Sequence, residues 1–240
     1  MSLVVVIPAY NAGRHIRGVL QRLIATEGLE LRRIVVVNDG SRDDTRAQVA
    51  AQRAPHVSID VIDRPHNGGY GAAMKDGLAA ALCSDPEIVA CVHADGQYSP
   101  EALPSLVRGL RERNLDLVQG SRIASGTALS GGMPLYKYLA NAVLNRLENH
   151  TLQLGMTDYH SGYLVYGSRS LHAVPFATLS NSFDFDLEVI ASARARGLCV
   201  GELPIPTHYG DETSHLQPIG YGLRVLRVLW NYRRGRYDPV

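Results

Sequence analysis

The sequence predicts an α/β fold in which a mostly parallel sheet carries helices on both faces. Short apolar runs, typical of strands buried on both faces, alternate with helical patterns through the first 120 residues. Such alternation indicates parallel strands joined by helical crossovers. A chain of 240 residues with 45% hydrophobic content is large enough for one substantial domain, and we expect a single one.

The expected elements follow a regular order in the first half and a less regular one in the second. Strands are expected at 3–8, 33–39, 57–63, 87–95 and 115–122, with helices between them at 13–26, 41–52, within 67–82 and after residue 99. Further on we expect helices within 130–152, at 181–197 and at 219–237, and strands within 158–167 and from 198. Ligands of such sheets bind beyond the carboxyl ends of the strands.

Composition and charge exclude several classes of protein. The formal net charge of +1 gives no overall basic character for binding nucleic acid. Cys83, Cys91 and Cys199 are odd in number and far apart, which argues against a disulfide framework or zinc site and for a reducing compartment; we expect Cys91 and Cys199 to be buried. With no signal-peptide pattern and no apolar run near the ~18 residues of a membrane span, we expect a cytoplasmic protein without a transmembrane segment.

Polar side chains stand where the expected strands end. They are Tyr10, Asn11, Asn38, Asp39, Asp63, His93, Asp95, Ser121 and Arg122. Because the strands are parallel, these residues from separate segments should share one edge of the sheet. Their convergence predicts a ligand site at that edge.

The segment HADGQ at 93–97 is the most informative of these strand ends. His93, Asp95 and Gln97 alternate after an apolar run, and alternating residues of a strand point to one side. A carboxylate and an amide oxygen suit a hard divalent cation, and an imidazole suits Mn²⁺ better than Mg²⁺. A tight turn at Asp95 and a structural histidine at 93 are the alternatives.

The ends of the first two expected strands bear on which class of nucleotide-binding protein this is. The segment PAYNAGRH after the first strand lacks the G-x-G-x-x-G pattern of dinucleotide-binding folds, which disfavours a dehydrogenase. It also lacks the glycine- and arginine-rich loop typical of sugar nucleotidyltransferases. Asp39 at the end of the second strand either accepts hydrogen bonds from a base or ribose, or forms a turn before Gly40.

Taken together, the strand ends resemble those of the family 2 glycosyltransferases, whose fold is called GT-A. The matching segments are VVIPAYNAG, VVVNDGSRDDT, NGGYGAAMKDG, HADGQYSPE and GSR, in this order. The later segments GGMPLYKYLAN, DYHSGYLVY, FDFDLEVI and IPTHYGDETSH are similar to the branch that contains dolichyl- and polyprenyl-phosphate sugar synthases. The resemblance implies a GT-A domain at 1–217, with a nucleotide-binding half at 1–122 and an acceptor-binding half at 123–217, and then a basic amphipathic helix at 218–240.

The resemblance implies a role for each matching residue. For the nucleotide sugar these are Pro8, Ala9, Tyr10 and Asn11 around the base, Asp39 on the base or ribose, and Gly68, Gly69 and Lys75 along the nucleotide. For a divalent metal, Mn²⁺ or Mg²⁺, they are Asp95 as the key acid of the D-x-D motif, with Gln97, His93 and His208, although His208 is equally compatible with a structural role. Arg122 would meet phosphate through its forked guanidinium, and Asp158 would lie close to the acceptor.

The chain departs from the family pattern at several positions. His93 replaces the first acid of D-x-D, Ala12 stands where an acid often follows PAYN, and Leu164 replaces the arginine of SGYR. The first change leaves metal binding at position 93 open, and the last removes a cation suited to phosphate. Members of this branch often carry membrane helices after the catalytic domain, and none is expected here.

The expected reaction moves a sugar, with inversion, from a nucleoside diphosphate sugar to polyprenyl phosphate. A phosphate monoester has a second pKa of ~6, so this acceptor is already anionic near pH 7 and needs orientation more than a base. The alternative acceptor is a hydroxyl of a glycan or small molecule, for which Asp158 would be the general base. Asp186 either faces the acceptor or only favours the start of a helix.

Two further alternatives stay open from the sequence. The C-terminal helix combines apolar residues with Arg224, Arg227, Arg233, Arg234 and Arg236. It either lies on an anionic membrane surface, at the inner face of the membrane, or packs on the domain with a solvated basic face. The alternative of another class is a non-catalytic module that binds nucleotide sugars.

Overall fold

The computed structural model describes residues 2–126, 128–206 and 218–239, and their strands form one sheet. The strands are β1 (Leu3–Ala9), β2 (Leu31–Asn38), β3 (Ser58–Asp63), β4 (Ile88–Cys91), β5 (Leu117–Ser121), β6 (Leu164–Gly167) and β7 (Val200–Pro204). Their order across the sheet is β3-β2-β1-β4-β6-β5-β7. Strand β6 runs antiparallel to both of its neighbours, and the other described pairs are parallel, which confirms the mostly parallel sheet.

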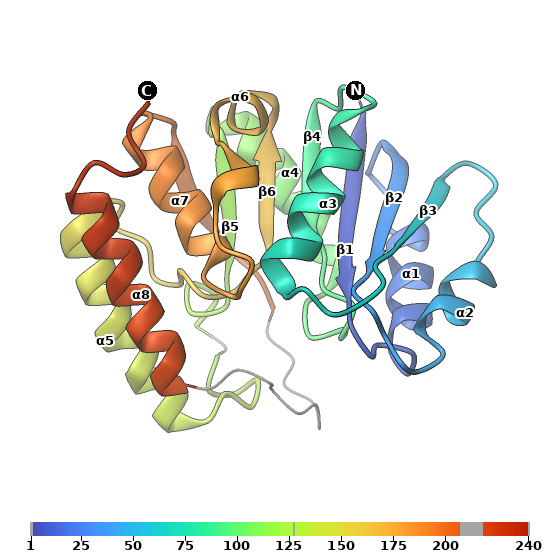
Figure 1. Ribbon diagram of the computed structural model, residues 1–240, viewed down its shortest axis with the longest axis horizontal. Coiled ribbons are helices and arrows are strands. Elements are labelled where there is room, and N and C mark those ends of the chain that lie inside the picture. Colours follow the sequence, from blue (N-terminus) through green and yellow to red (C-terminus); the bar gives the residue numbers. More distant parts are fainter. Residues whose placement is uncertain (1, 127, 207–217, 240) are drawn as a thin grey trace.

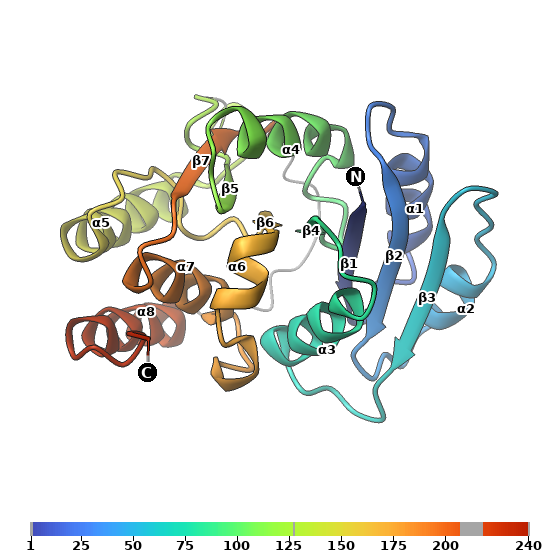
Figure 2. The same ribbon diagram turned by 90° about the horizontal axis from the view of Figure 1, so that it is seen from above.

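Helices cover both faces of this sheet (Figures 1 and 2). They are α1 (Ile16–Ala25), α2 (Thr45–Ala50), α3 (Tyr70–Leu82), α4 (Leu103–Glu112), α5 (Leu135–Leu152), α6 (Ser168–Ala173), α7 (Phe185–Ala195) and α8 (Pro218–Arg233), with 3-10 turns η1 (Pro100–Ala102) and η2 (Phe176–Thr178). Residues of α1, α2 and α4 pack into one core, and residues of α3, α6, α7 and α8 pack into the other. The predicted α/β architecture is thus confirmed.

The strands are continuous apolar runs because each face of the sheet is covered by helices. In β1, Val4 and Val6 face the core beneath α3 and α7, whereas Val5 and Ile7 face the core beneath α1 and α4. All four side chains are almost completely buried. Successive residues of a strand point to opposite faces of the sheet. Because both faces are covered here, an alternating polar pattern would bury polar side chains against apolar ones.

Strand β6 ties the second half of the chain into the middle of the sheet. The chain leaves β5, forms α5, and returns as β6 between β4 and β5, pairing Ala90 with Val165 and Val118 with Val165. Helix α8 buries Val225 and Val228 in the same core as α3 and α7. The two predicted halves therefore share one sheet, and the boundaries at 122 and 217 remain predictions.

Several expected boundaries were wrong. Strand β4 ends at Cys91, because its pairing with β1 stops there and its pairing with β6 stops at Ala90, so 93–97 is a loop and not the end of a strand. Helix α1 begins at Ile16, later than expected, whereas strand β6 lies within the expected range 158–167. Cys91 is buried as expected, but Cys199 precedes β7 and is exposed. Within the described residues, no helix is long and apolar enough to cross a membrane.

Gly77 on α3 gives a test of the packing between helix and sheet. A Cβ at this position would lie 2.3 Å from Cγ1 of Val6 and 3.2 Å from Cγ2 of Val37. We therefore expect Gly77→Ala to lower the free energy of unfolding by about 1–3 kcal/mol, although alanine favours a helix. Urea unfolding monitored by circular dichroism measures this change.

The matched control is Gly18→Ala on α1. A Cβ at Gly18 would have no neighbour within 4 Å, so only helix propensity acts there. We expect this variant to be stabilised by about 0.5–1 kcal/mol. Equal effects of the two substitutions would contradict the close packing of α3 on β1 and β2.

Candidate active site

The carboxyl ends of β1, β2, β4 and β5 meet at the lower edge of the sheet in Figure 1, and Asp39 lies there after β2. Asp39 is only 3% exposed. Its carboxylate accepts hydrogen bonds from the backbone N–H groups of Gly68 at 2.9 Å and Gly69 at 3.0 Å, and it pairs with Arg64 at 3.0 Å. Asp39 therefore anchors the turn that starts α3, and its contact with a base or ribose remains a prediction.

The glycines of this turn make room for another segment of the protein. A Cβ on Gly69 would lie 2.4 Å from the carbonyl oxygen of Asn181, and one on Gly71 would lie 2.3 Å from that of Ser180. The amine of Lys75 donates to the carbonyl of Leu179 and, at 2.8 Å, to Oδ1 of Asn181. The segment before α7 is thus held against the start of α3, and the role of Lys75 along a nucleotide remains a prediction.

The loops after β1 and β2 are joined to each other by hydrogen bonds. The side chain of Asn11 accepts from the N–H of Arg42, and the N–H of Asn11 donates to the hydroxyl of Ser41. Pro8 and Ala9 complete β1, with Ala9 buried, whereas the ring of Tyr10 is 41% exposed at the rim. The structure therefore brings the predicted base-pocket residues to one edge and leaves the tyrosine ring accessible.

His93 and Asp95 lie together in the loop after β4. The Nε2–H of His93 donates to the carbonyl of Gly162 at 3.1 Å, and its ring packs against Tyr98 and Tyr70, with centroids 4.9 and 5.5 Å away. Burial lowers the pKa of His93, against the opposing charge of Asp95. The imidazole is therefore neutral near pH 7 and carries its lone pair on Nδ1.

Asp186, in the first turn of α7, reaches the same place from the other half of the chain. Its Oδ2 accepts from the hydroxyl of Tyr70 at 2.8 Å, and its buried Oδ1 has no hydrogen-bond partner among the described residues. A Cβ on Gly162 would lie 2.7 Å from Nε2 of His93 and 3.3 Å from Oδ2 of Asp186. Burial raises the pKa of Asp186 to about 7, although the bond from Tyr70 acts in the other direction.

Arg122 and Asp158 form a buried ion pair at the end of β5. The guanidinium binds the carboxylate through two bonds, Nε to Oδ2 at 2.8 Å and Nη2 to Oδ1 at 3.0 Å. Asp158 is completely buried and Arg122 is 11% exposed. Burial acts to raise the pKa of Asp158, but the charge and hydrogen bonds of Arg122 outweigh it and hold the pKa below its ordinary value.

A second buried polar cluster lies behind this pair and was not foreseen from the sequence. The ring of His160 places Nδ1 2.8 Å from the hydroxyl of Tyr221 and Nε2 3.2 Å from Oε2 of Glu148. The backbone N–H of His160 donates to Oδ1 of Asp158 at 3.0 Å. Glu148 is completely buried on α5. Glu148 and Tyr221 come from segments far from His160 in the sequence, so no local pattern indicates their contact.

The loop after β4 offers the chemistry for a divalent cation, although the protein supplies few ligands. Oδ1 of Asp95 accepts from the N–H of Gln97 at 3.0 Å. Within the described residues, no group of three or more His, Cys, Asp or Glu side chains is arranged to hold a metal, and His208 lies outside those residues. Mg²⁺ is commonly held by one or two carboxylates with substrate phosphates and water. Asp95 therefore fits an ion that is shared with a diphosphate.

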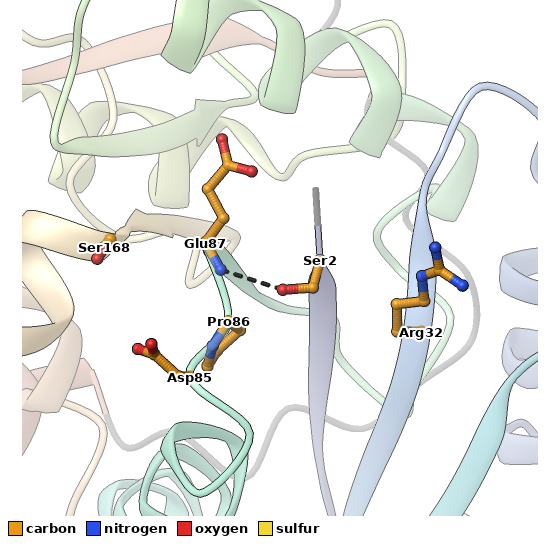
Figure 3. A pocket seen from close by; sticks show the side chains of 6 residues that line it. All are labelled: Ser2, Arg32, Asp85, Pro86, Glu87 and Ser168. Atoms are coloured by element: carbon orange, nitrogen blue, oxygen red, sulfur yellow. Dashed lines mark hydrogen bonds between the residues drawn. The ribbon is translucent and has the colours of Figure 1, made fainter.

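The hollow drawn in Figure 3 lies at the opposite edge of the sheet. It has a volume of about 460 Å³ and is lined by Ser2, Arg32, Asp85, Pro86, Glu87 and Ser168. Five of these residues stand at the amino ends of the parallel strands β1, β2 and β4, and Ser168 follows the antiparallel strand β6. Ligands of open α/β sheets bind at the carboxyl ends of the parallel strands. We therefore place the candidate site at the rim that holds Asp95, Arg122 and Asp186.

Residues 4–174 match the family described as "Glycosyl transferase family 2", and the chain belongs to this family. An uncharacterized protein of Methanocaldococcus jannaschii is 30% identical over 88% of this chain and 83% of its own. A UDP-N-acetylglucosamine–dolichyl-phosphate N-acetylglucosaminyltransferase of Methanococcus voltae is 26% identical over 86% and 85% of the two chains. An undecaprenyl-phosphate mannosyltransferase of Micrococcus luteus is 27% identical over 85% and 83%.

A solved structure shows the same fold. Glucosyl-3-phosphoglycerate synthase from Mycobacterium tuberculosis, in complex with Mn²⁺, UDP and glucosyl-3-phosphoglycerate, superimposes with a TM-score of 0.71 at 18% identity over all of this chain and 81% of that one. The fold is therefore GT-A, and the resemblance to the branch of polyprenyl-phosphate sugar synthases is confirmed by the relatives.

Asp158→Asn tests the buried ion pair. Removing one charge leaves the Arg122 guanidinium uncompensated, so we expect the free energy of unfolding to fall by about 3 kcal/mol at pH 7. A lowered folded-state pKa stabilises the protein above the ordinary pKa of an aspartate, and this stability is lost as the pH falls through the folded-state value. The difference from wild type should therefore shrink below about pH 4.

The matched control for that prediction is Asp60→Asn on β3. Asp60 pairs with Arg33, but both side chains are partly exposed, so we expect a loss below about 1 kcal/mol. Urea unfolding at a series of pH values measures both variants. Equal losses at pH 7 would contradict a special role for the Arg122–Asp158 pair.

Asp186→Asn should have the opposite pH dependence. The raised folded-state pKa means that folding favours the protonated carboxyl group. Its contribution to the stability of the protein is fully present below the ordinary pKa of an aspartate and is lost as the pH rises through about 7. Asparagine resembles the protonated acid, so the variant should become more stable than wild type by up to about 1.4 kcal/mol per pH unit between pH 4 and 7. Urea unfolding in chelator measures this, and a gap that does not change with pH would contradict it.

Proposed function

We propose that this family 2 glycosyltransferase moves a sugar from a nucleoside diphosphate sugar to a polyprenyl phosphate, with inversion at the anomeric carbon. The observation that carries the proposal is the rim itself, where Asp95 after β4 and Asp186 on α7 each keep a carboxylate oxygen that the described residues do not use. Two relatives that share most of the chain are named for dolichyl phosphate and undecaprenyl phosphate.

The nucleotide half of the proposal rests on the loops after β1 and β2. Their mutual hydrogen bonds and the bonds from Gly68 and Gly69 to Asp39 hold the rim rigid at the start of α3. We assign residues 1–122 to nucleotide binding, with the accessible ring of Tyr10 against the base. Preorganised loops of this kind bind a ligand at a lower entropic cost.

The diphosphate would lie near Asp95 and Arg122. A divalent cation held at Asp95, Mn²⁺ or Mg²⁺, would neutralise charge on the departing diphosphate. Asp158 fixes the plane of the Arg122 guanidinium through two hydrogen bonds, so the guanidinium is oriented before substrate binds. Glucosyl-3-phosphoglycerate synthase, which has the same fold, was crystallised with Mn²⁺ and UDP.

The acceptor half of the proposal concerns residues 123–217. A lipid phosphate is anionic near pH 7 and attacks the anomeric carbon without a general base, provided it is oriented. The protonated form of Asp186, favoured by its raised pKa, would avoid repelling this anion. We propose that the acceptor is met at the cytoplasmic surface of a membrane.

A hydroxyl acceptor is the second candidate, and the geometry then favours Asp186 over Asp158 as the base. Asp158 is saturated by Arg122, and its lowered pKa makes it a weak base. Asp186 has an unpartnered buried oxygen and a pKa of about 7, which is well matched to proton transfer near neutral pH.

The first experiment measures thermal stability with UDP, GDP, CDP or dTDP, each with Mn²⁺, Mg²⁺ or chelator. A ligand that binds only the folded state raises stability by mass action. We expect a shift with one nucleotide that requires metal and is lost in Asp95→Ala but kept in Glu27→Ala, an exposed acid after α1. The absence of any shift in the wild-type protein would sink the metal–diphosphate site.

The second experiment separates the two acceptors. With the matching nucleotide sugar, we expect transfer to short-chain polyprenyl phosphates that survives in Asp186→Asn within about tenfold, because no proton has to be removed. Transfer to a hydroxyl acceptor that falls more than a thousandfold, by an order-of-magnitude estimate for loss of a base, would support the second candidate instead. Nucleotide binding without turnover on any acceptor or water would identify a non-catalytic module.

A further inference from the structure

Helix α5 is turned so that it buries polar residues and exposes large apolar ones. Its inward face carries Asn145 and Glu148, which are 7% and 0% exposed. Its outward face carries Leu135, Tyr136, Leu139, Val143 and Leu147, which are between 42% and 64% exposed. Residues spaced by three and four lie on one side of a helix, so these five form a continuous apolar stripe. A stripe of this kind on a folded protein indicates an interaction surface.

Helix α8 carries a second stripe of the same kind. Val225 and Val228 face the core, while Leu223, Leu226 and Trp230 on the outward side are 64%, 48% and 57% exposed. Arg234 lies over the ring of Trp230, with its guanidinium carbon 4.6 Å from the ring centroid. The helix is therefore apolar on two sides, and only one of them is covered by the domain.

The two stripes belong to one edge of the molecule. Helices α5 and α8 contact each other and lie together beyond β7 at the end of the sheet, on the left in Figures 1 and 2. His160 joins them from inside, through Tyr221 of α8 and Glu148 of α5. Both helices begin at the rim that carries the candidate site and run away from it (Figure 1).

The charged side chains that the two helices themselves carry are almost all positive. Across 135–152 and 218–233 the single acidic residue is Glu148, which is buried. Arg146 on α5, Arg227 and Arg233 on α8, and Arg234 directly after it are exposed cations, and Arg227 also borders a hollow lined by Asp184 and Glu188. In the described part of the chain, none of these four arginines forms an ion pair. The surface thus combines apolar side chains with uncompensated positive charge.

We propose that the outward faces of α5 and α8 form one docking surface for an anionic lipid bilayer. Apolar and aromatic side chains insert at the level of the head groups, and arginines beside them bind lipid phosphates. The charge pattern argues against a second copy as the occupant, because a two-fold dimer through this face would set one arginine-bearing patch against an identical one. The inference rests on the proposed lipid acceptor in one respect: the surface would bring the rim to the membrane where that acceptor lies.

Trp230 gives a direct probe of the surface, because it is the single tryptophan of the chain. We expect its fluorescence to shift to shorter wavelength with vesicles of phosphatidylcholine containing about 30% phosphatidylglycerol, and not with phosphatidylcholine alone. Brominated lipid should quench it. Co-sedimentation with the same vesicles should weaken as salt is raised, since charge attraction is screened.

Variants of both helices test whether they act as one surface. We expect Leu139→Glu/Val143→Glu on α5 to weaken binding of anionic vesicles about tenfold or more, as should Arg233→Glu/Arg234→Glu on α8. Arg14→Glu/Arg17→Glu changes exposed arginines near the start of α1, on the other side of the molecule, and lowers the net charge by the same four units as the α8 variant. It is the matched charge control, and we expect it to bind anionic vesicles more strongly than the α8 variant does.

Nucleotide-dependent thermal stability, measured on the same variants, separates this inference from the proposed function. Wild-type-like nucleotide shifts together with lost vesicle binding show that the variants fold and support the docking surface. Vesicle binding that persists in the α5 variant, or is equal for neutral and anionic vesicles, overturns it. So does light scattering that shows a dimer converted to monomer by the α5 variant while the wild type binds no vesicles.

Discussion

The bidentate pair between Arg122 and Asp158 joins the two parts of the chain at the rim. Arg122 directly follows β5, and Asp158 precedes the antiparallel strand β6, which returns between β4 and β5. The pair is buried, so its electrostatic attraction is screened weakly by water, and each charge would be costly without the other. The loop that it anchors delivers Gly162 to His93 and the N–H of His160 to Asp158 itself.

The acids of the rim divide into two kinds according to their partners. Asp39 and Asp158 are saturated by the protein: the first holds the turn before α3, and the second holds Arg122. Asp95 and Asp186 keep an oxygen that the described residues do not use. A saturated carboxylate stabilises the fold and orients its neighbours, whereas an unsaturated one is ready to meet a cation or a proton. The chemistry of the site therefore belongs to the second kind.

Helix α5 connects the site with the outer surface. Its buried Glu148 and the Tyr221 hydroxyl of α8 both meet His160, two residues from Asp158. The cost of burying these polar groups is met only in part by hydrogen bonds within the cluster. Because the polar side of α5 faces inward, its apolar side faces outward beside the arginines of α8. This one orientation of the helix therefore both supports the rim and creates the exposed surface.

From the sequence alone, the sheet, the convergence of polar residues on one edge and the membership of the family were predictable. Strand periodicity and the direction of parallel strands determine the first two locally, and the family was indicated by the resemblance of the ordered segments at the strand ends. Asp186, the Glu148–His160 cluster and the end of β4 at Cys91 were decided by tertiary structure, because burial and pairing across distant segments are not encoded in local spacing. The same holds for Asp158: its sequence position indicates an acid near the acceptor, but only the fold places Arg122 against it and lowers its pKa.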